Sequence, residues 1–507
     1  HLAQTVLSDY VINTLLLCVG VGSVSIVAGT GCAWLVTMHE FPGRRFFDWA
    51  LVVPLAMPAY VLAYAYTDLL QFTGPVQTAI RNFTGWGWQD YWFPSIHSLG
   101  GAVFVLSAVL YPYVYVVARA AFLEQSICVL EVSRTLGCPP AAMFRRVALP
   151  LARPAIAAGA TFVLMETLAD FGAVKYFEVA TFTTGIYRTW YAYGNPAAAA
   201  QLASALLLFV FAVLLLERLS RGRGRYAHTS TRYRQIRRLP FTRTGTLGAM
   251  LFCALPLTVG FGLPAVVLAT MALDSSEPAS WNRLAQLAGN TLFIGLLASV
   301  LVVGAALAAL YGVRRDRRPV SRAFVRVALL GYATPGVVIA VGILIVIGLF
   351  DHTVDAAARR LFGVSTGLVL AGSFAAILYG CLVRFFAVAY GPLDAGFAKI
   401  RPSLEDAART LGSTVAGVLV RVHLPLMRGS ILSAALLVFV DVMKELPATM
   451  ILRPFNFDTL AVEAFQLATT ERLDAAALPS LVIVAAGLVP VIILCRAIGR
   501  ARPGHAD

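Results

Sequence analysis

Long apolar stretches dominate this sequence and limit the folds that it can adopt. A helix needs about 20 mostly apolar residues to cross the hydrocarbon core of a bilayer, where water cannot hydrogen-bond the backbone. Eleven stretches meet this standard. We predict membrane-spanning helices at residues 11–37, 48–71, 97–120, 152–171, 198–217, 246–272, 290–312, 324–350, 367–390, 430–451 and 478–497.

The composition agrees with a bilayer as the solvent of this chain. Of its 507 residues, 59% are hydrophobic and 13% are charged, whereas soluble domains carry about 25% charged residues. The seven cysteines are scattered without a CxxC pair, so neither a disulfide framework nor a zinc site is predicted. Most of the net charge of +14 lies in short connections between apolar stretches, which indicates membrane topology rather than nucleic-acid binding.

Basic residues recur in every second connection between the apolar stretches. Such connections stay on the cytoplasmic side of a membrane protein. They contain Arg44 and Arg45; Arg134, Arg145 and Arg146; nine arginines from Arg218 to Arg243; Arg314, Arg315, Arg317 and Arg318; the segment from Lys399 to Arg428; and Arg496, Arg500 and Arg502. This topology places His1 outside with five crossings before the arginine-rich segment and six after it, so we expect a further helix before His1.

The two halves of the chain repeat one another. Four residues of the first half recur 275 positions later, Gly137, Leu149, Pro150 and Arg153 as Gly412, Leu424, Pro425 and Arg428. The same offset relates Glu166 to Asp441 and Asp170 to Glu445, while Asn13-Thr14 and Pro58 recur after 277 positions as Asn290-Thr291 and Pro335. We therefore predict an all-α membrane bundle of two fused, parallel halves of about six helices each. The halves are residues 1–217 and 246–507, joined by a cytoplasmic arginine-rich linker at 218–245.

One repeated cytoplasmic segment has the pattern of two short helices joined by a turn. It runs from Glu131 to Pro150 in the first half and from Asp406 to Pro425 in the second, within loops that we place at 124–151 and 393–428. A glycine in each copy suits the left-handed end of the first helix. We expect a second, amphipathic helix to follow and the proline to stop it.

These segments resemble the signature of the permeases of ATP-binding-cassette importers, which reads Glu-Ala-Ala, three residues, Gly, and later an aliphatic residue followed by x-Leu-Pro. The resemblance implies a type I importer permease fold in which both segments dock on a cytoplasmic ATPase. The implied docking residues are Glu131, Gly137, Leu149, Pro150, Asp406, Ala407, Ala408, Gly412, Leu424 and Pro425. This chain departs from the signature at Val132-Ser133 and at Asp406, which has Glu405 beside it.

The sequence contains no nucleotide-binding loop of its own. A P-loop needs a lysine directly after a glycine-rich turn, and the three lysines, Lys175, Lys399 and Lys444, stand in other settings. We therefore expect no catalytic residue and no stably bound cofactor. ATP would be hydrolysed by two copies of a separate ATPase, one for each half.

Charged residues inside the apolar stretches are costly in a bilayer and are therefore candidates for function. Glu166 and Asp170 lie four residues apart on one predicted helix face, and Asp441, Lys444 and Glu445 occupy the matching place in the second half. These residues fit a set of salt bridges that holds the helices together. They equally fit a translocation path, and the sequence leaves both interpretations open.

Around these acids the sequence resembles the fused two-half permeases of ferric iron importers, most specifically at 162–174, 181–190, 439–449 and 453–460. The resemblance covers nearly the whole chain. It implies a multi-pass protein of the bacterial inner membrane that receives Fe(III) from a periplasmic or lipid-anchored binding protein. Fe(III) prefers oxygen ligands, and the candidate residues of the path or gate are Glu166, Asp170, Asp441, Lys444, Glu445, Tyr187 and Asp458. Tyr187, Arg188, Arg453 and Asp458 also suit contact with the binding protein, and no resident metal site is predicted.

Two alternatives remain open. Sister permeases of the same architecture carry other small ionic solutes, such as thiamine, sulfate, polyamines or phosphonates. A secondary transporter driven by protons or ions would use the intramembrane acids as a relay. Such a transporter has no need of an ATPase-docking segment in each half, which favours the importer.

Overall fold

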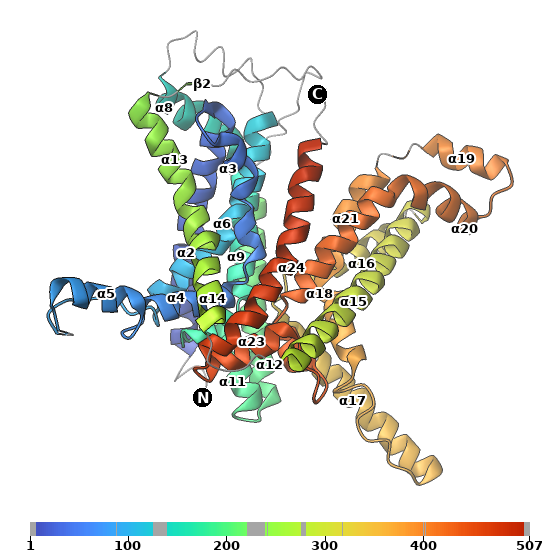
Figure 1. The fold of residues 1–507 in the computed structure, drawn as a ribbon. Helices are drawn as coiled ribbons and strands as arrows, with labels where there is room; N and C mark the ends of the chain where they lie inside the picture. Colours follow the sequence, from blue (N-terminus) through green and yellow to red (C-terminus); the bar gives the residue numbers. More distant parts are fainter. Residues whose placement is uncertain are drawn as a thin grey trace. The chain divides into compact units, whose positions relative to one another are not determined.

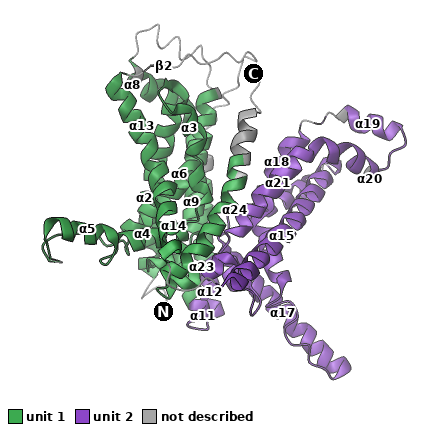
Figure 2. Ribbon diagram, viewed as in Figure 1, with its two compact units in different colours: residues 1–188, 204–277, 464–507 green, residues 189–203, 278–463 purple. Residues whose placement is uncertain are grey.

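A computed structural model describes residues 7–87, 89–124, 139–220, 239–240, 242–274, 280–316, 318–398, 400 and 402–500. It contains two compact units (Figure 2). Unit 1 comprises residues 1–188, 204–277 and 464–507, and unit 2 comprises residues 189–203 and 278–463. The units do not coincide with the two halves of the sequence, because the opening and closing helices of the second half belong to unit 1.

The described residues of unit 1 are helical (Figure 1) apart from connecting segments and one pair of two-residue parallel strands. In this pair His39 lies opposite Leu239. Its elements are α2 (Leu7–Met38), β1 (His39–Glu40), α3 (Arg44–Ala50), the 3-10 turn η1 (Val53–Ala56), α4 (Ala59–Leu70), α5 (Pro75–Thr84), α6 (Leu99–Glu124), α8 (Pro140–Met143), the π-helical turn η2 (Phe144–Ala148), α9 (Leu149–Ala169), α10 (Gly172–Tyr176), β2 (Leu239–Pro240), α13 (Arg243–Leu257), the π-helical turn η3 (Thr258–Gly262), α14 (Leu263–Asp274) and α24 (Leu473–Arg500).

Unit 2 contains the long helices of the second half. Its elements are α15 (Trp281–Arg315), α16 (Pro319–Leu329), α17 (Gly336–Phe362), α18 (Phe374–Phe397), α19 (Pro402–Thr410), α20 (Val415–Val418), the π-helical turn η4 (Leu419–His423), α21 (Leu424–Met443) and α22 (Pro447–Leu452). The boundary between the units falls within three further helices, α11 (Phe182–Tyr191), α12 (Pro196–Ser220) and α23 (Leu460–Thr469).

Nine helices in the described part of the chain are long and apolar enough to cross a membrane, and one bent pair would make ten. The chain is therefore a multi-pass helical membrane protein, as the apolar stretches predict. The closing crossing, predicted at 478–497, lies within α24, whose apolar part from Leu473 to Val489 is shorter. The predicted arginine-rich linker falls largely outside the described residues.

Three predicted crossings are wrong as single helices. The one at 430–451 runs past the end of α21 at Met443 into α22. The stretch at 48–71 bends by 93° between the pair 44–56 and 59–84, and the stretch at 324–350 is divided between α16 and α17. Pro58 and Pro335 stand at these breaks as the residues before α4 and α17, with extended ψ angles of 141°. Because proline lacks an amide hydrogen, it starts a helix better than it continues one.

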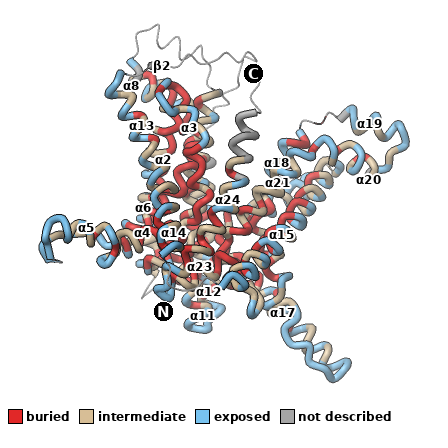
Figure 3. The backbone as a smooth tube through the Cα atoms, viewed as in Figure 1, coloured by how far each residue is buried: buried red, intermediate tan, exposed pale blue. Residues whose placement is uncertain are grey.

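The predicted repeat is visible in the bounds of the elements. The turns η2 and η4 and the starts of α9 and α21 are each 275 positions apart, and α2 and α15 end 277 positions apart. Each unit has a core of three long helices that pack pairwise, α2, α6 and α9 in unit 1 and α15, α18 and α21 in unit 2. Figure 3 shows buried residues along these cores, whereas α5 and the end of α17 are mostly exposed.

Small residues let the core helices of unit 1 approach closely. A Cβ atom at Gly29 of α2 would lie 2.8 Å from both the Tyr111 carbonyl oxygen and the Tyr115 amide nitrogen of α6. A Cβ atom at Gly159 of α9 would lie 2.8 Å from the Cα atom of Val114, which is also on α6. Backbone atoms cannot rotate away, so α6 is held between two glycine contacts, an arrangement typical of membrane helices.

We expect Gly29→Ala to force α2 and α6 apart and to lower the free energy of unfolding by about 1–3 kcal/mol, the usual cost of overpacking. Gly304→Ala is the matched control, because Gly304 is exposed on α15 and a Cβ atom there has no neighbour within 4 Å. The thermal midpoint of the detergent-solubilised protein measures both effects. Equal midpoints for the two variants would contradict the proposed close contact.

Candidate functional site

The second candidate docking segment has the turn that the sequence predicts. Helix α19 ends at Thr410, and Gly412 follows with a φ angle of +82°. The Gly412 amide donates to the Arg409 carbonyl at 2.9 Å, and the Ser413 amide donates to the Ala408 carbonyl at 3.0 Å. These bonds close the helix with a left-handed residue, a conformation that glycine adopts without strain.

The outer face of this segment is exposed. Asp406, Ala407 and Gly412 are exposed, and Ala408 is half-buried. The apolar side chain of Leu411 at the turn is 86% exposed. A large apolar side chain beside exposed charges of both signs, Asp406 and Arg409, is the mixed chemistry expected of a protein docking surface.

The inner face of the segment is anchored to the long helices of unit 2. Arg314, at the end of α15, pairs with Glu405 at 2.6 Å and donates to the carbonyls of Phe397 and Ile400 at 3.3 and 3.1 Å. The ring of buried His423 stacks on Phe397 with centroids 4.7 Å apart. The His423 Nε2 atom lies 3.5 Å from a Glu405 carboxylate oxygen. These contacts connect α19 to the ends of α15 and α18 and to η4.

The predicted role of the prolines as helix stops is wrong. Pro150 and Pro425 lie in the first turns of α9 and α21, directly after Leu149 and Leu424. The chain continues through the π-helical turns η2 and η4, so that residues 416–443 form one continuous helix. A π-helical turn provides the space that a proline ring needs within a helix.

Residues 131–138 of the first docking segment lie outside the described part of the chain, which resumes at residue 139. Glu131 and Gly137 are among the residues not described, so their predicted docking role stays a prediction. In the described part, an aromatic cluster of Trp34, Phe122 and Phe144 packs against η2, with ring centroids 4.9–5.4 Å apart.

The repeated acids lie where helices end rather than on one helix face. Helix α9 ends at Ala169, so Asp170 does not continue the face that carries Glu166. The Asp170 carboxylate instead accepts the amide of Val174 in α10 at 3.1 Å. In the second half, Glu445 accepts the amide of Ala448 in α22 at 2.8 Å. Both acids therefore satisfy backbone donors at the start of the next short helix.

The acids of the second half are also paired with cations. Lys444 binds Asp441 at 2.9 Å, three residues apart as the spacing predicts. Buried Glu445 faces Arg384 of α18 across 3.4 Å. The predicted stabilising interactions are therefore present within unit 2. Arg384 is the partner that the sequence analysis did not identify, although an arginine inside a predicted crossing was a usable signal.

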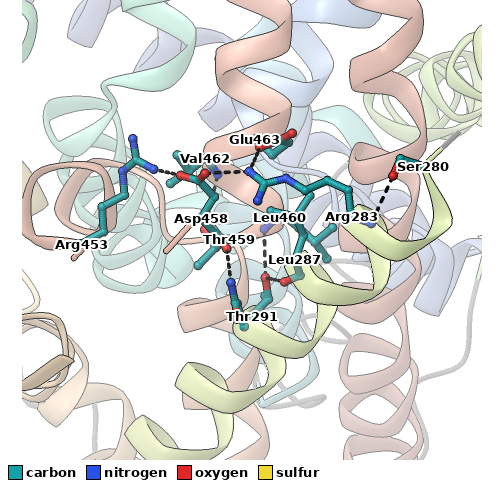
Figure 4. Close-up of polar contacts among 11 residues, drawn as sticks. Ser280, Arg283, Leu287, Thr291, Arg453, Asp458, Thr459, Leu460, Val462 and Glu463 are labelled. Atoms are coloured by element: carbon teal, nitrogen blue, oxygen red, sulfur yellow. Dashed lines mark hydrogen bonds and ion pairs between the residues drawn. The ribbon is translucent and has the colours of Figure 1, made fainter. Parts of the chain in front are cut away.

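A polar cluster surrounds Asp458 near the start of α23 (Figure 4). Arg283 binds Asp458 and Glu463 at 2.8 Å each, and Arg453 forms a further ion pair with Asp458. Asn290 donates to the Asp458 carbonyl at 2.9 Å. Two arginines thus hold the Asp458 carboxylate, which makes it part of a structural anchor for this loop.

In each repeated Asn-Thr pair, the asparagine binds the backbone of a later connecting segment in its own unit. In unit 1, Asn13 donates to the Ala180 carbonyl at 3.0 Å, next to Thr181, as Asn290 does next to Thr459. Thr291 additionally accepts the amide of Leu460 at 2.9 Å, the first residue of α23 (Figure 4). Both asparagines and Thr291 are therefore structural, whereas the Thr14 hydroxyl is buried without a hydrogen-bond partner among the described residues.

Tyr187 packs against Phe171 within unit 1, with the two rings tilted by 46° and their centroids 4.9 Å apart. A path or gate role for Tyr187 stays a prediction. Within the part of the chain that the structure describes, no three His, Cys, Asp or Glu side chains lie close enough together to hold a metal ion.

The fold is that of a multi-pass helical membrane protein. Residues 25–225 match the family described as the binding-protein-dependent transport system inner membrane component. The match lies almost entirely in the first half of the chain, which is therefore similar to the ABC-type permeases of binding-protein-dependent transport, as the motif predicts.

Three relatives illustrate the range of the class. The Fe(3+)-transport system permease protein FbpB 2 of Haemophilus influenzae is 25% identical over 96% of this chain and 90% of its own length. The molybdenum transport system permease protein ModB of Escherichia coli is 27% identical over 39% of this chain and 86% of its own length. The sulfate transport system permease protein CysW of Escherichia coli is 31% identical over 30% of this chain and 50% of its own length. The relatives are transport permeases rather than enzymes.

We expect Asp458→Asn to release both arginines from the loop and to lower the free energy of unfolding by about 1–2 kcal/mol. This is less than the 3–5 kcal/mol for a fully buried pair, because the arginines are partly exposed. Glu40→Gln is the control, since the Arg44–Glu40 pair is exposed at its acid and such pairs contribute about 0–1 kcal/mol. A thermal midpoint for Asp458→Asn as high as that of Glu40→Gln would disprove the anchoring role.

Proposed function

We propose that this chain is the membrane subunit of an ATP-driven importer of ferric iron in the bacterial inner membrane. It would work with two copies of a cytoplasmic ATPase and with a periplasmic or lipid-anchored iron-binding protein. The cargo is supported by the Fe(3+)-transport permease of Haemophilus influenzae, which matches 96% of this chain. The molybdenum and sulfate permeases match 39% and 30% of it.

The geometry of the second docking segment carries the proposal of an external ATPase. Leu411 and Gly412 form an exposed turn, while Arg314 and Glu405 on the opposite side hold the segment to α15. A partner bound at the turn can therefore pull on the long helices of unit 2. That is the mechanical requirement for turning nucleotide-driven closure of an ATPase into a change of the permease.

We assign the docking residues accordingly. Asp406, Ala407, Ala408 and Gly412 would face the ATPase, and Leu424 and Pro425 would join the segment to α21. Residues Glu131, Gly137, Leu149 and Pro150 would do the same in the first half. ATP hydrolysis would reside in the partner, and this chain would supply no catalytic residue and hold no stable cofactor.

A second candidate cargo is a small oxyanion, which the molybdenum and sulfate relatives favour. ATP hydrolysis by the copurified complex separates the candidates when binding proteins loaded with Fe(III), molybdate or sulfate are added in turn. Stimulation by the ferric-loaded protein alone supports the proposal. Stimulation by an oxyanion-loaded protein alone would replace the cargo, and failure to copurify with any ATPase would favour secondary transport.

Gly412→Val provides a test of the docking turn. A β-branched residue is strained at a φ angle of +82°, so the variant should distort the turn and reduce stimulated ATP hydrolysis about tenfold, which corresponds to about 1.4 kcal/mol. Gly363→Val is the matched control, because Gly363 has a φ angle of +66° at the end of α17, outside the docking segment. An equal loss of stimulation in both variants would show that general strain, not docking, is responsible.

A further inference from the structure

Three tyrosines gather in unit 1, next to the break that Pro58 makes before α4. The rings of Tyr60 and Tyr64 on α4 lie 5.8 Å apart, and the ring of Tyr176 on α10 lies 4.8 Å from that of Tyr64. Tyr60 and Tyr64 are buried, with 5% and 1% of their surfaces exposed, whereas Tyr176 is half-buried. The cluster therefore runs from the interior of unit 1 to its surface.

Carboxylates stand beside the phenols in the chain. Asp170, at the end of α9, accepts the amide of Val174 in α10 at 3.1 Å, and Tyr176 follows two residues later in the same helix. Asp68 lies one helical turn after Tyr64 on α4. Carboxylates attract cations.

The hydroxyl group of Tyr64 is buried without a hydrogen-bond partner. Leaving such a group unpaired is unfavourable, and a native protein that retains one needs a reason for it. A phenol oxygen next to a carboxylate is a hard ligand, of the kind that a trivalent cation prefers.

The internal repeat shows that packing does not require these phenols. The positions of Tyr60 and Tyr64 correspond, 277 residues later, to Val337 and Val341 in α17, and the position of Tyr176 corresponds, 275 residues later, to Ile451 in α22. The same architecture is therefore built with aliphatic side chains in unit 2.

The acid of the cluster differs between the units in the same way. Glu445, the equivalent of Asp170, faces Arg384 at 3.4 Å. The position that corresponds to Arg384 in unit 1, 275 residues earlier, is Val109, which is buried. Where unit 2 has a salt bridge and three aliphatic side chains, unit 1 therefore has an acid and three phenols.

We propose that Asp170, Tyr64 and Tyr176 form a transient binding site for Fe(III) on its way through unit 1. The inference rests on the proposed function, because it takes ferric iron as the cargo. Each phenol that binds would exchange its O–H bond for an Fe–O bond and release the proton to water, and no electron is transferred. Transport requires such a site to bind the ion and also to release it.

Fe(III) bound by phenolate oxygens absorbs visible light through ligand-to-metal charge transfer, which gives a direct measurement. The purified complex is titrated with Fe(III) nitrilotriacetate. We expect a visible band that Tyr64→Phe weakens, with a loss of Fe(III) affinity of about tenfold or more. Tyr176→Phe should act in the same direction, and its half-buried position makes it the safer variant for folding.

Tyr111→Phe is the matched control. Tyr111 is a buried tyrosine of α6 whose hydroxyl donates to the Leu51 carbonyl at 3.0 Å, outside the cluster. Loss of the Tyr111 hydroxyl group should leave the visible Fe(III) band unchanged. A wild-type complex without the band, or a band of equal strength in all three variants, would overturn the site.

The same variants separate failure of the site from failure of the proposed function. Stimulation of ATP hydrolysis by the ferric-loaded binding protein tests the function without depending on the band. If stimulation is present and the band is absent, only the phenol site is wrong. If the ferric-loaded protein does not stimulate hydrolysis at all, the proposed cargo is wrong and the site inference falls with it.

Discussion

In a bilayer every backbone amide and carbonyl must find its hydrogen-bond partner inside the protein. Long apolar helices meet this requirement, and the chain departs from them at a few places. Helices break at Pro58 and Pro335, and again after Ala169 and Met443. Each break exposes backbone donors that need partners. Two of the breaks are satisfied by carboxylates, Asp170 and Glu445, which explains why acids recur at this place in both halves.

The two units have different side chains at equivalent positions of the repeat. Unit 2 has fixed ionic contacts, Arg384 with Glu445 and Arg283 with Asp458, and an ionic anchor between Arg314 and the docking segment. Unit 1 has phenols and acids at the corresponding break. A duplicated architecture allows such division, because one copy can keep the packing while the other changes its chemistry.

Hydropathy and residue spacing predict much of this fold. The apolar stretches predict the crossings, the repeat predicts where elements recur, and Gly412 predicts the left-handed end of α19. The local pair of Asp441 and Lys444 also follows from spacing. Hydropathy did not reveal the breaks at Pro58 and Pro335, because a straight and a bent apolar segment have the same hydropathy.

Contacts between distant parts of the chain were beyond sequence analysis. Arg384 and Glu445 are 61 positions apart, and Arg283 and Asp458 are 175 apart. Pro425 was misread as a helix stop because a π-helical turn is not visible in residue types. The phenol cluster was missed for the same reason, since Tyr64 and Tyr176 meet only after the chain has folded.

Uptake of radioactive iron by proteoliposomes tests the central claim most directly. The vesicles contain this chain and its ATPase, with ATP enclosed at the ATPase side and ferric-loaded binding protein on the other. We predict uptake that requires ATP, the binding protein and an intact Gly412 turn. Iron uptake that proceeds without ATP, or that follows an imposed proton gradient instead, would contradict the account.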